Sequence, residues 1–210
     1  MTDLSKQFEH ALLSIDRLEA NRVVAAAAAR MTSMELVDHV IAAALLRIGE
    51  RWEQGDVALS QVYMGGRLCE ELVDRLLPPG DPQRKNQPSM AIAVLDDYHA
   101  LGKRIVYSVL RSGGFDLKDY GTVTVDEVIR KVQADHIRVL LISTLMLHSA
   151  LRVRDVVAGL KAADLDVKVV VGGAPFIFDD QLWREVGADA MGHSASDATD
   201  IIRTIMGGSA

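Results

Sequence analysis

Hydrophobic and polar residues alternate with two different periods on either side of residue 80. In the first part, apolar residues recur every three or four positions, the period of an amphipathic helix. Two segments follow this spacing: Met34, Val37, Ile41, Ala44, Ile48 and Trp52, then Leu59, Val62, Gly66, Cys69, Val73 and Leu76. Two earlier helices are expected at about residues 4–18 and 22–31. No single one of these helices could bury its apolar stripe alone, so they predict a four-helix bundle.

In the second part, short apolar runs alternate with amphipathic segments. The runs that predict strands are residues 90–95, 115–120, 138–144, 167–171 and 188–191. Helices are expected between them, and a last one over 196–206. Repeated strand–helix units of this kind predict a five-stranded, doubly wound parallel sheet.

A polar segment rich in proline separates the two patterns. Four of the five prolines fall at positions 78, 79, 82 and 88. We therefore expect a helical domain at 1–80, a linker at 81–88 and an α/β domain at 89–210.

Composition narrows the classes of function. The chain has 210 residues, of which 49% are hydrophobic, and a formal net charge of −6, which argues against general affinity for nucleic acid or anionic membranes. The single cysteine, Cys69, excludes an internal disulfide and is expected to be a buried thiol. The first residues lack the pattern of a secretory signal, so a cytoplasmic location is expected.

The segment Asp97-Tyr98-His99-Ala100-Leu101-Gly102 carries the clearest chemistry. It follows a predicted strand, and ligands of open parallel sheets bind at the carboxyl ends of the strands. Asp97 and His99 are two residues apart, so their side chains leave an extended backbone on the same side. A carboxylate can then hold one imidazole nitrogen while the other binds a metal.

Three further motifs follow at predicted strand ends: Ser143-Thr144-Leu145, Gly172-Gly173 and Gly187-Ala188-Asp189. With D-x-H-x-x-G before them, they resemble the motifs of cobalamin-binding domains of the methionine-synthase type. The resemblance implies a flavodoxin-like strand order. It also implies that His99 is the lower axial ligand of cobalt, in place of the cofactor's own benzimidazole, and that Asp97 accepts a hydrogen bond from its other ring nitrogen.

The resemblance implies roles for several further residues. Ser143 would complete an Asp–His–Ser relay. Gly102, Gly172 and Gly173 would leave room for the nucleotide tail of cobalamin, and Leu145 would form an apolar wall of that slot. His148 and His193 also follow predicted strands, and we expect them to be exposed loop histidines.

The helical domain resembles the cap of corrinoid methyltransferase proteins, most clearly over residues 49–60. Trp52, Tyr63 and Met64 are candidates for the surface that covers the corrin, but we expect each of them to pack in the helical core, as aromatic and Met residues at helical spacing usually do. The implied function is a corrinoid protein that carries a methyl group through a methyl-Co(III)/Co(I) cycle. Its partners would be a separate substrate:corrinoid methyltransferase, a methyl-acceptor methyltransferase and a reductive activator, and the chain would not be an independent catalyst. Methanol, methylamines and aryl methyl ethers stay open as donors.

Other functions fit the sequence less well. A cobalamin sensor would place W-x(9)-E-H in the cap, but Val62-Tyr63 stand at that spacing from Trp52. The small subunit of a mutase would lack this cap. A phosphorylation receiver needs an aspartate where Ser143-Thr144 stand, and dinucleotide binding needs a glycine motif that the first strand lacks.

Three residues depart from the family pattern. Asp96 stands where a glycine is frequent, Leu147 where threonine is common, and Met191 near the position of an aromatic residue.

Overall fold

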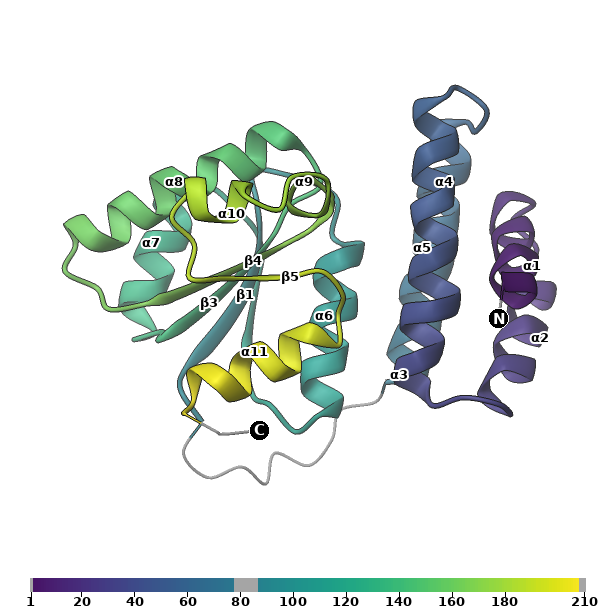
Figure 1. The fold of residues 1–210 in the computed structure, drawn as a ribbon, viewed down its shortest axis with the longest axis horizontal. Helices are drawn as coiled ribbons and strands as arrows, with labels where there is room; N and C mark the ends of the chain where they lie inside the picture. Colours follow the sequence, from purple (N-terminus) through teal and green to yellow (C-terminus); the bar gives the residue numbers. More distant parts are fainter. Residues whose placement is uncertain (1, 78–86, 208–210) are drawn as a thin grey trace. The chain divides into compact units, whose positions relative to one another are not determined.

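The chain divides into two compact units, Met1–Pro78 and Pro79–Ala210. The computed structural model describes residues 2–77 and 87–207 (Figure 1). Most of the predicted linker, residues 81–86, lies outside the described residues. No helix in these two ranges is long and apolar enough to span a bilayer.

The first unit is entirely helical. Its elements are α1 Thr2–Leu13, α2 Arg17–Ala28, α3 Ser33–Leu36, the π-helical segment η1 Val37–Ala42, α4 Ala43–Glu53 and α5 Leu59–Leu76. Because α3, η1 and α4 follow one another without a break, the unit has the four predicted helical segments. Thr32 begins the third with a capping box that it shares with Glu35. Fully buried side chains fill the centre of the unit, among them Phe8, Leu12 and Ile41.

The boundary between the first two helices differs from the prediction. α1 ends at Leu13 rather than near 18, and α2 begins at Arg17 rather than 22. Ile15 adopts a positive φ of 55°, which stops the first helix, and the Asp16 carboxylate caps the second by accepting a hydrogen bond from the Glu19 backbone. The apolar spacing continues across this corner, so periodicity alone did not locate it.

The second unit is a five-stranded parallel sheet between helices. The strands are β1 Met90–Leu95, β2 Lys118–Val123, β3 Val139–Ser143, β4 Lys168–Gly172 and β5 Ala190–Gly192. Their order, β2-β1-β3-β4-β5, confirms the flavodoxin-like prediction. The helices are α6 Leu101–Ser112, α7 Val125–Ala134, α8 Leu147–Ala162, α9 Ala174–Phe178, α10 Leu182–Glu185 and α11 Asp197–Ile205.

The second strand lies three residues later than the predicted 115–120. Phe115 and Leu117 are buried, but they pack beneath the sheet before the strand begins. β2 itself is an edge strand with exposed polar residues. The apolar signal is therefore weaker in β2 than in the loop that precedes it, and for this reason the strand was predicted too early.

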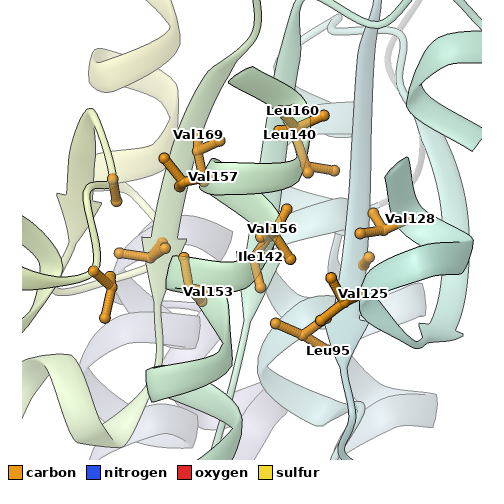
Figure 2. Close-up of a cluster of buried hydrophobic side chains, with 14 of the residues drawn as sticks. Leu95, Val125, Val128, Leu140, Ile142, Val153, Val156, Val157, Leu160 and Val169 are labelled. Carbon is orange, nitrogen blue, oxygen red and sulfur yellow. The ribbon is translucent and has the colours of Figure 1, made fainter. Parts of the chain in front are cut away.

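Side chains that alternate along the strands build a core on each face of the sheet. On one face, Leu140 and Ile142 of β3 pack with α7 and α8 (Figure 2). On the other face, Val139 and Leu141 pack with residues of α6 and α11. Each fully buried side chain of this size contributes about 1.5–3 kcal/mol through burial. The two cores hold the carboxyl ends of β1, β3 and β4 at a common edge.

Candidate functional site

The predicted site residues meet where the strand order reverses. β1 and β3 are neighbours in the sheet, and the chain leaves them toward opposite ends of it. In open α/β sheets, this reversal opens a crevice at the carboxyl edge. Asp97 and His99 follow β1, and the segment 143–146 ends β3 beside them.

Asp97 is buried and satisfied at both carboxylate oxygens. Oδ2 accepts hydrogen bonds from the backbone N–H groups of Leu145 (2.9 Å) and Met146 (3.1 Å). Oδ1 accepts from the backbone N–H of His99 (3.1 Å). Burial alone would raise the pKa of Asp97, but its hydrogen bonds from the His99 ring and these backbone groups outweigh burial and lower the pKa. Asp97 is therefore an anion in the folded protein.

The ring of His99 is oriented by that anion. Its Nδ1 lies 2.5 Å from Asp97 Oδ1. Because an ionised carboxylate can only accept, Nδ1 carries a proton, and in the tautomer that this contact selects Nε2 keeps its lone pair. The His99 side chain is 48% exposed, so Nε2 is accessible to a ligand.

This arrangement offers a metal one protein ligand. Within residues 2–77 and 87–207, no group of three His, Cys, Asp or Glu side chains could hold a metal ion. A metal that brings its other ligands with it, as the cobalt of a corrin does, could use His99 as its protein ligand.

Small residues line the sheet edge on the α6 side. A Cβ added to Gly102 would lie 3.4 Å from Ser143 Oγ, and one added to Gly172 would lie 3.4 Å from the carbonyl oxygen of Gly192. At these positions the absence of a side chain lets the Gly102 backbone lie close to Ser143 and the Gly172 backbone lie close to Gly192. Gly192 was missed from sequence because no motif marks it.

Gly173 has a different role from Gly172. Its φ is +119°, and a Cβ there would lie 1.8 Å from the carbonyl oxygen of Thr144. The glycine is required because the β3 and β4 loops touch at this point. It shapes the edge and offers no side-chain contact.

The serine next to the Asp97 loop is Ser149, which sequence analysis did not identify. Its fully buried hydroxyl donates to the backbone carbonyl of Asp96 (3.0 Å). Among the described residues, the Ser143 hydroxyl forms no hydrogen bond with Asp97 or His99, and its nearest marked neighbour is Gly102. The structure therefore does not join Ser143 to the Asp–His pair. The only sequence signal for Ser149 is its position near the start of the helix that follows the third predicted strand.

Asp96 turns the chain at the end of β1. Its φ is +45°, a left-handed conformation that explains why glycine suits this position. Its Oδ2 atom is buried without a hydrogen bond, and the nearest cation is Arg152 at 3.7 Å. The left-handed backbone and the buried carboxylate oxygen without a hydrogen bond both cost stability.

Exposed apolar side chains lie on the two segments that meet at Asp97. Tyr98 is 94% exposed, and Leu145, Met146 and Leu147 from the β3–α8 connection are also exposed. His148 and His193 are exposed, as expected, but His148 lies in the first turn of α8 and not in a loop. An open apolar surface around one accessible imidazole suits a large flat ligand better than a small ion.

Other predicted features have structural roles or remain open. Asp189 of the G-A-D motif accepts from the backbone N–H of Val169 (2.8 Å) and fixes the start of β4, away from the site. Cys69 is buried, and burial raises the pKa of its thiol. Trp52, Tyr63 and Met64 are exposed in the helical unit, so the expectation that they pack in its core is wrong.

Comparisons with known proteins agree on one class. Two families described as B12 binding domain match residues 89–203 and residues 4–77. The trimethylamine corrinoid protein of Methanosarcina barkeri is 30% identical over 190 residues, 86% of each chain. Trimethylamine corrinoid protein 1 of Methanosarcina acetivorans is 28% identical over 91% of each chain. The structure of Methanosarcina barkeri monomethylamine corrinoid protein superposes with a TM-score of 0.81 at 24% identity, covering 97% of this chain and 99% of that one.

Proposed function

The chain belongs to the B12 binding domain family, and from that premise we propose that it binds cobalamin with His99 as the lower axial ligand of cobalt. The Asp97–His99 pair carries this proposal. It holds the imidazole in one tautomer and leaves the lone pair of Nε2 free to bind cobalt. A second hydrogen bond of this kind orients a metal-binding histidine and increases its basicity.

The remaining residues fit the rest of the cofactor. The exposed apolar residues around His99 suit the face of a corrin ring. The nucleotide tail must leave the metal once His99 replaces its base, and we propose that it lies in a slot along the edge formed by Gly102, Ser143, Gly172 and Gly192, because three of these four residues have no side chain. Leu145 contributes its backbone N–H to Asp97 and its exposed side chain to this edge.

We further propose that the protein carries a methyl group between methyltransferases. When bound, the corrinoid supplies a cobalt centre that accepts and releases methyl groups. The support is the similarity, over most of both chains, to proteins named as methylamine corrinoid proteins. Methylamines are therefore the proposed donor class. A methylamine:corrinoid methyltransferase, a methyl-acceptor methyltransferase and a reductive activator would be the partners.

Reconstitution tests the proposal. The wild-type protein, mixed with hydroxocobalamin under anaerobic reducing conditions and desalted, should retain the cofactor in near-equimolar amount. Given a trimethylamine methyltransferase and methyl-labelled trimethylamine, it should then retain label.

His99→Ala should lose both properties, whereas His148→Ala, at another exposed histidine of the same edge, should keep them. A wild-type protein that stays colourless after desalting would contradict cofactor binding. Retained cofactor without label from mono-, di- or trimethylamine would contradict the donor class.

A further inference from the structure

Lys103 is a buried cation beside the candidate site. It is 5% exposed, and its Nζ lies 2.5 Å from both carboxylate oxygens of Asp119 on β2. Lysine is almost never this buried without a partner. The pair therefore joins the first turn of α6 to the edge strand.

The first turn of α6 has little local stability of its own. No side chain caps it at Ala100, and Gly102 occupies its second position. Lys103 at the third position places a positive charge at the positive end of the helix dipole. Contacts outside the helix must hold this turn in place.

The edge strand is shaped to supply such a contact. Between Ile92 and Val94 of β1, the register of β2 gains one residue, which is a β-bulge. Gly121 in the bulge has a φ of +69°, and its N–H donates to Asp119 Oδ1 (2.8 Å). The bulge thus fixes the carboxylate in the position where Lys103 meets it.

We propose that Lys103 is a positioning residue for the nucleotide-tail slot. By anchoring the first turn of α6 to Asp119, it holds Gly102 next to Ser143, on one side of the proposed slot. The inference rests on the proposed function, because the slot matters only if a corrinoid tail enters it. Because the Lys103 ammonium group is paired with Asp119, the proposed role acts through the position of Gly102 and not through a direct contact with the cofactor.

Lys103→Met tests this role, since Met keeps an unbranched side chain only one atom shorter and removes its charge. The dissociation constants of cobalamin and of cobinamide, which lacks the nucleotide tail, are measured for each protein. Wild type should prefer cobalamin, and Lys103→Met should weaken cobalamin at least about tenfold while leaving cobinamide within about twofold. Amide exchange in the first turn of α6 should also become faster in the cofactor-free variant.

Two further variants make the result specific. Lys118→Met removes an exposed ion pair with Asp135 from the same strand and should change neither dissociation constant. Asp119→Asn removes the charge of the other, more exposed member of the pair and should reproduce the effect of Lys103→Met. It replaces Lys103→Met in the test if that variant does not fold.

If Lys103→Met and Asp119→Asn weaken the binding of cobalamin and cobinamide equally, the inference is overturned. General destabilisation of the protein would affect both corrinoids, whereas a role at the slot affects only the one with a nucleotide tail. Unchanged cobalamin affinity would overturn it as well. A wild-type protein that binds neither corrinoid would instead contradict the proposed function.

Discussion

At the scale of single residues, the partners of Asp97 decide the chemistry of the site. The backbone of Leu145 and Met146 occupies one oxygen, and His99 occupies the other. The carboxylate cannot rotate without breaking several hydrogen bonds, so the imidazole is oriented before any ligand arrives. From the sequence, the D-x-H spacing predicted the pair, but not the backbone groups that fix it, because those come from a segment 48 residues away.

Asp96→Gly should stabilise the α/β unit. Glycine removes the cost of a left-handed backbone and of a buried carboxylate oxygen without a hydrogen bond. The expected gain in the free energy of unfolding is about 1 kcal/mol, measured by urea denaturation. Asp96→Ala is the control, since it removes the carboxylate but keeps the Cβ. If the glycine variant is no more stable than the alanine variant, the backbone argument fails.

Gly173→Ala should strongly destabilise the same unit. The new Cβ would lie 1.8 Å from the Thr144 carbonyl oxygen, so the β3 and β4 loops must separate. Gly121→Ala is the matched control, because Gly121 also has a positive φ but open space around it. Denaturation should show a loss at Gly173 that exceeds the control by about 2 kcal/mol. Similar losses at both positions would show that φ, rather than the loop contact, makes glycine necessary.

At the scale of elements, apolar periodicity predicted most accurately the strands and helices whose apolar side chains are fully buried. β1 and β3 have strongly buried residues and appear within one residue of the predicted bounds. The corner between α1 and α2 depends on one left-handed residue, Ile15, which leaves no mark in the pattern. β2 is polar because it lies at the sheet edge, so its strongest apolar signal came from the preceding loop. A left-handed corner residue and the place of a strand at the sheet edge become visible only when the three-dimensional structure is known.

An ionic cluster between α1 and α4 makes the stability of the helical unit depend on pH. The Glu9 carboxylate accepts from Arg47 Nε (2.7 Å) and Arg51 Nη1 (3.1 Å). Burial raises the pKa of Glu9, but the two guanidinium groups outweigh it and the net pKa is lowered. A carboxyl group with a lowered folded pKa stabilises the fold above its unfolded pKa of about 4.3, and this is lost as pH falls through the folded value.

Glu9→Gln should therefore cost about 1–2 kcal/mol of unfolding free energy near neutral pH. The difference from wild type should narrow as the pH falls below about 4, as followed by circular dichroism in urea. Glu71→Gln, which breaks the more exposed pair with Arg17, should cost little at any pH. A penalty for Glu9→Gln that is constant with pH would contradict the ionic explanation.

At the scale of the whole molecule, the chain forms two compact units, each with its own buried core. The α/β unit supplies the proposed ligand, the apolar surface around it and the tail slot, all on elements fixed by the sheet. The helical unit presents Trp52, Tyr63 and Met64 to its surface rather than to its core. The site residues Asp97, His99, Gly102, Ser143, Leu145, Gly172 and Gly173 all lie at or next to the carboxyl ends of three neighbouring strands or at the start of α6.

The most direct test of this account is the electron paramagnetic resonance spectrum of the Co(II) form after reconstitution with cobalamin. Coupling to one axial nitrogen should be present in wild type and should change its pattern when the protein's histidines carry ¹⁵N. It should disappear in His99→Ala and persist in His148→Ala. Coupling that survives His99→Ala, or that does not respond to ¹⁵N-histidine, would mean that the nitrogen comes from elsewhere and that His99 is not the ligand.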